Sequence, residues 1–280
     1  MPLLVLVIAA LLVGGVVGLA ASRWPVGAER PHVARVGLAR RLDPGAATGL
    51  ALTLALVVLI GGGLVLAVLA FVIRSDPDAI GLDAAAADWG DDEATSFTAD
   101  VLNAITKVGA PGSIVVLAIV LGVVETVRTR SKWVIPFLFL VVAGNGTITT
   151  TIKNLADRVR PTLNPVAETL GPSFPSGHSS WSAAFFAAAA LLLARGRGRR
   201  TRIVLSGVAA GAAVTIAATR VLLDVHWLSD VVAGLALGWA WFAVCAIAFG
   251  GRLLEFGATA EEMGGQRDPP ARYVASKRAS

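Results

Sequence analysis

Two histidines of this chain occur in settings that suit proton transfer and nucleophilic attack. His226 is followed four residues later by Asp230, and this spacing places both side chains on one face of a helix. A histidine held by a carboxylate keeps one tautomer and offers its other ring nitrogen as a base or nucleophile. A second histidine, His178, is then available as the general acid.

Three basic residues supply the charge that such chemistry needs. Lys153, Arg160 and Arg220 fall at or near the ends of apolar segments, on the same side of the chain's expected layout as the histidines. A charged side chain in that position costs free energy unless it binds a partner such as an anion. Only six residues separate Lys153 from Arg160, so both can converge on one anion.

A helix start completes the anion site. The sequence Pro175-Ser176-Gly177-His178 directly precedes an apolar segment, which places the Ser176 hydroxyl and two free backbone N–H groups at a helix N-terminus. A cationic cage with two histidines is suited to phosphoryl transfer. The cage stabilises the equatorial oxygens, one histidine attacks the phosphorus and the other protonates the leaving oxygen. The cations already supply the charge that Mg²⁺ provides elsewhere, so we expect no metal and no cofactor.

The elements that carry these residues are membrane-spanning helices. Of the 280 residues, 55% are hydrophobic and 15% are charged, which excludes an ordinary water-soluble domain. About 20 apolar residues cross the hydrocarbon as a helix. Seven segments qualify, at 1–22, 49–73, 112–127, 133–152, 177–194, 203–223 and 228–250. We expect an all-α, multi-span transmembrane bundle: an N-terminal helix with a basic cytoplasmic linker (1–48), a six-span core (49–250) and a disordered cytoplasmic tail (251–280).

Between the second and third spans, residues 75–111 begin as an acidic loop that includes Asp83. At 97–108, apolar residues recur at helical spacing, which predicts an amphipathic helix. Such a helix either lies in the membrane interface or covers the end of the bundle. The spacing does not choose between the two.

The basic residues assign the sides of the membrane. The formal net charge is +5, but no exposed domain carries the basic patch that nucleic-acid binding requires. Eighteen of the 24 Lys and Arg residues fall in four segments on one side of the alternating spans: 22–48, 127–132, 195–202 and 252–280. By the positive-inside rule this side is cytoplasmic, the N-terminus is outside and the C-terminus inside. The first helix lacks the basic start of a cleaved signal peptide, so we expect it to be retained.

Three motifs resemble, in order and spacing, the signature motifs of the type 2 phosphatidic acid phosphatase superfamily: Lys153-x6-Arg160-Pro161, Pro175-Ser176-Gly177-His178 and Arg220-x5-His226-x3-Asp230. The resemblance covers about 75–250. It implies that His226 is the nucleophile that forms a phosphohistidine, that Asp230 orients it and that His178 is the general acid. It also implies a set of phosphate-binding residues: Lys153, Arg160, Ser176, Gly177 and Arg220.

Two positions depart from the family's third motif. Thr219 stands where the family usually has Ser, which keeps a hydroxyl. Asp224 stands where Gly is common. A carboxylate there can pair with a site arginine, repel phosphate, or contact a substrate hydroxyl or a cation bound to pyrophosphate; the sequence does not rank these roles.

The leading hypothesis is a membrane phosphatase that cleaves a lipid phosphate or pyrophosphate at the outer face. Polyprenyl pyrophosphate, phosphatidate and phosphatidylglycerol phosphate are the candidates that the family implies. A phosphotransferase that uses the same histidine is the alternative. A transporter is less consistent with the sequence, because the middles of three spans carry no ionisable group. The vanadate-dependent haloperoxidases of the same superfamily resemble soluble helical proteins, and seven apolar spans argue against that activity.

Overall fold

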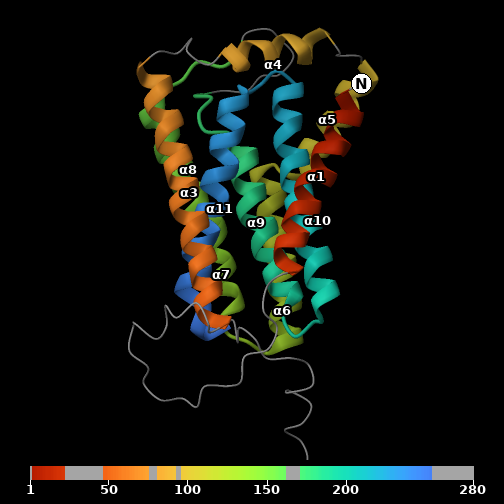
Figure 1. Cartoon of the computed structure of the whole chain (residues 1–280), viewed down its shortest axis with the longest axis vertical. Coiled ribbons are helices and arrows are strands. Elements are labelled where there is room, and N and C mark those ends of the chain that lie inside the picture. Colours follow the sequence, from red (N-terminus) through yellow and green to blue (C-terminus); the bar gives the residue numbers. More distant parts are fainter. Residues whose placement is uncertain (1, 23–46, 76–80, 93–95, 162–170, 254–280) are drawn as a thin grey trace, which may run out of the picture.

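The computed structural model describes residues 2–22, 47–75, 81–92, 96–161 and 171–253. Within these ranges the chain is helical, with no strand, and forms one elongated bundle (Figure 1). Most of the predicted basic linker (23–46) and nearly all of the predicted disordered tail (254–280) lie outside the described residues.

Within the described ranges, six helical segments are long and apolar enough to cross a membrane, as the sequence predicts for the core. They comprise α3 (Ala47–Ser75), α6 (Pro111–Thr129), the continuous run α7 (Val134–Phe139), η1 (Leu140–Gly144) and α8 (Asn145–Ala156), then α9 (Gly177–Ala194), α10 (Arg199–Leu222) and α11 (Leu228–Leu253). The additional helix α1 (Pro2–Ser22) packs along α10 and has a shorter apolar stretch, Leu3–Gly18. The chain is therefore a multi-pass membrane protein with an extra N-terminal apolar helix.

The run α7–η1–α8 contains a π-helical turn that the sequence did not predict. In η1 the backbone hydrogen bonds join residues five positions apart, one more than in an α-helix, so the turn contains an additional residue. The indole Nε1 of Trp241 on α11 donates to the carbonyl of Leu140 at 3.1 Å. This contact stabilises the irregular turn that leads into α8, the helix that carries Lys153.

Helices α9 and α11 approach closely because small residues line their contact. A Cβ atom built on Gly234 would lie 2.5 Å from the carbonyl oxygen of Ser176, and one on Gly238 would collide with the carbonyl of Ser180. Glycines four residues apart allow such backbone approach between membrane helices. The approach also aligns the two helix starts, because the backbone N–H of Ser176 donates to the carbonyl of Asp230 at 2.9 Å.

Two further helices cover one end of the bundle. The amphipathic helix predicted at 97–108 is confirmed as α5 (Ser96–Val108), which packs on α10 with Leu102 buried and Phe97 exposed. The acidic segment before it is not a loop, as the sequence suggested, but contains α4 (Gly81–Asp92). In Figure 1, α4 lies across the end of the bundle. Its Asp83 is buried because Arg158 and Ser229 bind the carboxylate.

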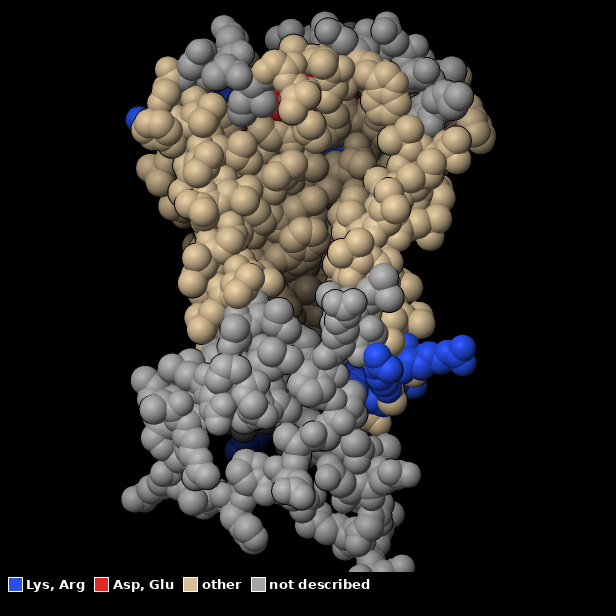
Figure 2. All heavy atoms as spheres, viewed as in Figure 1, with Lys and Arg blue, Asp and Glu red and all other residues tan. Residues whose placement is uncertain are grey.

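Basic side chains gather at the opposite end of the bundle. In Figure 2 they form a blue cluster near the lower end of the tan surface, at the end where α9 leads into α10. Arg197, Arg199 and Arg200 are exposed there. The two ends of the bundle therefore differ in charge, as the sequence predicts.

The α9–α11 contact gives the first testable prediction. Replacing Gly238 with Leu forces a side chain against the α9 backbone, and overpacking of this kind costs about 1–3 kcal/mol. We expect a lower midpoint of thermal unfolding in detergent. The matched control is Gly63→Leu on α3, because Gly63 is exposed and has no atom within 4 Å of a built Cβ. Equal midpoints for the two variants would contradict the prediction.

Candidate active site

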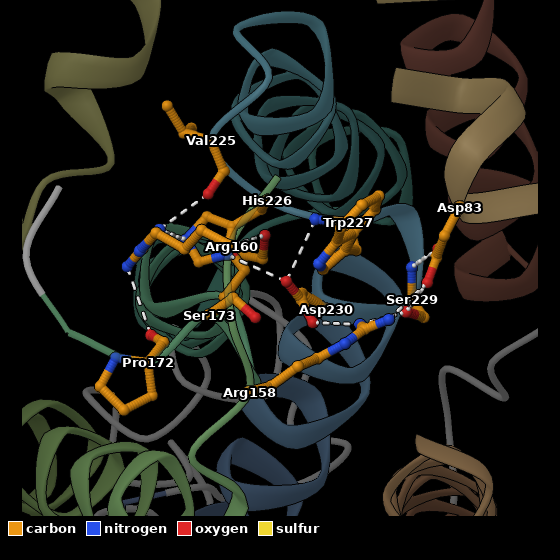
Figure 3. Close-up of polar contacts among 12 residues, drawn as sticks. Asp83, Arg158, Arg160, Pro172, Ser173, Val225, His226, Trp227, Ser229 and Asp230 are labelled. Carbon is orange, nitrogen blue, oxygen red and sulfur yellow. Dashed lines mark hydrogen bonds and ion pairs between the residues drawn. The ribbon is translucent and has the colours of Figure 1, made fainter. Parts of the chain in front are cut away.

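All three motifs meet at the end of the bundle covered by α4 and α5. The first motif runs from the last turn of α8 into the segment after it, and the second forms the start of α9. The third spans the end of α10, a short turn and the start of α11. Residues 66 positions apart in the sequence are therefore neighbours, as Figure 3 shows for Arg160 and His226.

His226 lies between a carboxylate and a guanidinium. Its Nδ1 is 3.3 Å from Oδ2 of Asp230, and its Nε2 is 3.2 Å from Nη1 of Arg160 (Figure 3). A carboxylate only accepts hydrogen bonds and an arginine only donates them. Nδ1 therefore carries the proton, and Nε2 presents its lone pair to the cationic side of the site.

The contact between His226 and Asp230 is confirmed, but its geometry is not that of one helix face. His226 precedes α11, which begins at Leu228. Its backbone N–H donates to the carbonyl of Arg220 at 3.1 Å, which closes the turn after α10. Asp230 Oδ2 also accepts the backbone N–H of Trp227 at 3.1 Å. The same carboxylate oxygen thus fixes both the turn and the ring.

Burial keeps His226 uncharged. The side chain is 3% exposed, and this desolvation lowers its pKa from 6.5 to about 4. The hydrogen bond and charge of Asp230 act in the opposite direction, whereas Arg160 and Lys153 lower the pKa further. The ring is therefore neutral at neutral pH, which a nucleophile or base requires.

Backbone carbonyl oxygens hold two of the predicted cations. Lys153 Nζ donates to the carbonyls of Pro172 and Ser173 at 2.6 and 3.2 Å. Arg160 donates from Nε to Gly171 at 3.0 Å and from Nη1 to Val225 at 2.7 Å. Burial lowers the pKa of Arg160 from its usual value, although nearby Asp230 raises it.

Arg220 has an unused donor. It is 6% exposed, and its Nη1 donates to the hydroxyl of Thr106 on α5 at 3.1 Å. Its buried Nε has no hydrogen-bond partner. A buried guanidinium donor without an acceptor is costly, and an oxyanion in the site would satisfy it.

The start of α9 faces the same space. Ser176 is fully buried, and its hydroxyl accepts a hydrogen bond from Ser179 at 2.9 Å. The backbone N–H groups of Gly177 and His178 belong to the first turn, which has no intrahelical acceptors. His178 interacts electrostatically with His226 and with the three cations Lys153, Arg160 and Arg220. The structure thus brings together all eight residues predicted from the motifs.

Sequence reasoning missed Arg158 and Asp83. Arg158 Nη1 lies 2.7 Å from Oδ1 of Asp230, and Nη2 lies 2.9 Å from Oδ2 of Asp83 (Figure 3). The charge pattern places Arg158 only among the six basic residues on the less basic side. Its position two residues before Arg160 was the available signal, whereas no motif marks Asp83.

The two departures from the family pattern have local explanations. Asp224 adopts a left-handed backbone conformation, with φ of 52°, which Gly adopts without strain. Asp224 is buried, with 4% of the residue exposed. The hydroxyl of Thr219 donates to the carbonyl of Ile216 at 2.6 Å and is used within α10.

Comparisons with known proteins agree with the motifs. The PAP2 superfamily profile matches residues 134–253. Lipid A 1-phosphatase from Rhizobium johnstonii is 34% identical over 135 residues, covering 43% of this chain and 51% of the relative. Decaprenylphosphoryl-5-phosphoribose phosphatase from Mycobacterium tuberculosis is 34% identical over 141 residues, covering 47% of this chain and 70% of the relative. Phosphatidylglycerophosphatase B from Bacillus subtilis is 28% identical over 144 residues, covering 50% of this chain and 69% of the relative.

A solved structure shares the fold. The transmembrane PAP2 type phosphatidylglycerolphosphate phosphatase from Bacillus subtilis superposes with a TM-score of 0.64 at 24% identity, covering 71% of this chain and 99% of that one. The match to the lipid A 1-phosphatases spans only about half of their length. With the three motifs gathered at one end of a six-span bundle, these relationships show that the chain belongs to the PAP2 superfamily.

Proposed function

We propose that this protein is a membrane phosphatase that hydrolyses a lipid phosphate or pyrophosphate through a phosphohistidine at His226. The observation that carries the proposal is the setting of this ring. It is buried and neutral, Asp230 holds the proton on Nδ1, and Nε2 faces a cluster of cations.

The chemistry follows from the groups around that nitrogen. Nε2 of His226 attacks the phosphorus, and the bond from phosphorus to the leaving oxygen breaks while His178 supplies a proton to that oxygen. The ring becomes cationic and keeps its Nδ1 proton against Asp230. Water then attacks the phosphorus and gives a proton back to His178, while the phosphorus–nitrogen bond breaks; this releases phosphate and restores the neutral ring of His226.

The cations and the helix start stabilise the charge on the phosphoryl oxygens. Lys153 and Arg160 are bound by neutral carbonyls, so their charges remain available, and Arg220 has an unused donor. The N–H groups that open α9 add oriented dipoles. Together these groups supply transition-state stabilisation of the oxyanion-hole type.

We assign the site to the outer face of the membrane. The exposed basic turn between α9 and α10 lies at the opposite end of the bundle, and the positive-inside rule makes that end cytoplasmic. The N-terminus is then outside and the C-terminus inside. A site at the ends of spanning helices is placed at headgroup depth, where it suits a phosphorylated lipid with its tail in the bilayer.

The first prediction for this function concerns the nucleophile. We expect His226→Ala to lower phosphate release by more than about 1,000-fold, because it removes the attacking nitrogen. Phosphate release by protein in detergent with EDTA is measured over phosphatidylglycerol phosphate, phosphatidate, a polyprenyl pyrophosphate, decaprenylphosphoryl-5-phosphoribose, lipid A and a soluble sugar phosphate. Wild-type activity persists in EDTA, and an acid-labile phosphoenzyme appears in the wild type but not in the variant.

The control is Leu192→Ala, which alters a buried apolar residue in the last turn of α9, at the end of that helix away from the site, and keeps activity. Unfolding midpoints of all variants confirm that each is folded. Wild-type rates in His226→Ala would overturn the phosphohistidine. A phosphorylated product that appears only when lipid or sugar acceptors are supplied would favour the phosphotransferase instead.

The pH dependence gives a second prediction. Neutral His226 is the reactive form, and burial lowers its pKa to about 4, so kcat/KM loses its histidine-dependent activity near pH 4 and not near 6.5. The second ionisation of a phosphate monoester, with a pKa of about 6, adds a separate step to the pH profile. In Asp230→Asn the group that raises the pKa of His226 loses its charge. The part of the pH profile that reports His226 therefore moves to lower pH, and the rate of the variant is lower than that of the wild type.

The substrate ionisation is the same for both enzymes, so the difference between their profiles reports His226. Asp100→Asn, an exposed change on α5, serves as the control and leaves that part of the profile in place. A shift of that part of the profile to higher pH in Asp230→Asn would contradict the assignment.

A further inference from the structure

We propose that Arg158 and Asp83 form a positioning pair that fixes the carboxylate of Asp230, and through it the tautomer and orientation of His226. The proposal deepens the phosphatase function and rests on it. It gives the surface helix α4, which lies before residues 134–253 that match the family profile, a part in positioning the site.

Asp230 is held from two opposite sides. Its Oδ2 accepts from Trp227 N and from His226 Nδ1, while its Oδ1 binds Nη1 of Arg158 at 2.7 Å. The residue is fully buried, so no solvent competes for either oxygen. Rotation of the carboxylate would break bonds on both sides, and this restricts it to the orientation that receives the Nδ1 proton.

Arg158 is itself fixed by three other contacts. Nη2 bonds Asp83 at 2.9 Å, Nη1 bonds the hydroxyl of Ser229 at 2.8 Å, and the guanidinium lies 5.4 Å from the ring centre of Trp227. The planar fork of Arg suits a bridge between two carboxylates. With both Nη groups bound to these partners and 8% of its side chain exposed, Arg158 directs the end of its guanidinium at Asp230, Ser229 and Asp83.

Asp83 anchors the pair to the start of α11. Its Oδ1 accepts the backbone N–H of Ser229 at 2.8 Å, and its Oδ2 accepts the Ser229 hydroxyl. Ser229 belongs to the first turn of α11, so a carboxylate from α4 satisfies an N–H group that has no partner within that helix. The helix α4 therefore holds both Arg158 and the backbone next to Asp230.

The electrostatic setting makes the two members of the pair act in opposite directions on His226. Asp230 of α11, Arg160 of the loop, Lys153 of α8 and His178 of α9 interact with its ring. Arg158 offsets part of the negative charge that Asp230 presents to the ring. Asp83 in turn offsets part of the positive charge of Arg158.

The kinetic test uses Arg158→Gln, Arg158→Lys and Asp83→Asn in the full-length protein, on a lipid phosphate that the wild type cleaves. Loss of groups that orient a site residue typically costs about 10–100-fold, so we expect Arg158→Gln to lower kcat by that factor with little change in KM. Arg158→Lys recovers part of the loss, because it keeps a cation but cannot bridge two carboxylates. Adding Asp83→Asn to Arg158→Gln lowers kcat little further, because Asp83 affects Asp230 through Arg158.

A second readout does not depend on activity. The chain has three histidines, so ¹⁵N-labelled imidazole signals resolve His226, with His226→Gln as the assignment control. We expect the Nδ1–H tautomer in the wild type. In Arg158→Gln the pKa of His226 rises, because Asp230 loses its compensating cation, and in Asp83→Asn it falls or stays unchanged. Arg200→Gln, at the exposed opposite end, leaves kcat and the imidazole signals unchanged.

The outcomes separate this proposal from the proposed function. An Arg158→Gln variant with wild-type kcat, an unaltered His226 tautomer and an unaltered pKa would overturn the positioning pair. A raised KM at unchanged kcat would also overturn it, because it would make Arg158 a phosphate ligand. If no lipid phosphate is cleaved by the wild type, the phosphatase proposal fails, while the imidazole signals still decide whether Arg158 and Asp83 position His226.

Discussion

Asp230 is the residue on which the rest of the site depends. Its backbone carbonyl receives the N–H of Ser176 and so joins the start of α9 to the start of α11. Its carboxylate holds the ring of His226, the backbone of Trp227 and the guanidinium of Arg158. One buried acid therefore connects the second motif, the third motif and the segment between Lys153 and Arg160. A residue that satisfies this many partners fixes the relative positions of helices as well as the chemistry of one ring.

The cationic part of the site follows a different rule. Lys153 and Arg160 are oriented by carbonyl oxygens of residues 171–173 and 225, which carry partial and not full negative charges. Carbonyls satisfy the donors and set their directions without neutralising them. The site therefore keeps its positive charge for an anion, while the carboxylate of Asp230 lies on the opposite side of the His226 ring from Arg160. Separation of these two roles allows a neutral nucleophile to sit beside a guanidinium.

The sequence predicted the six core spans and the grouping of the eight motif residues at one end of the bundle, because hydrophobic runs and short spacings are local signals. The i, i+4 relation of His226 and Asp230 held even though His226 lies before the helix, since a tight turn brings the same two side chains together. The contacts of Asp83 escaped prediction because they join residues about 75 and 146 positions apart. An acid in an acidic segment is expected to be solvated, and only the tertiary position of Arg158 makes its burial favourable. The π turn at η1 escaped for a similar reason, because the partner of Leu140 is a tryptophan on another helix.

The first helix is best understood from the contacts that it makes near the site. Gly14 of α1 and Gly207 of α10 allow their backbones to meet, since a Cβ on either would lie 2.7 Å from the carbonyl oxygen of the other. This approach aligns the N-terminal end of α1 with the turn after α10. Leu6 packs there in one buried cluster with Leu102 of α5 and with Val225, whose carbonyl binds Arg160. The turn that carries His226 is thus supported by α1 on one side and by the contacts of α4 and Arg158 on the other. Elements outside the segment that matches the family hold its central histidine in place.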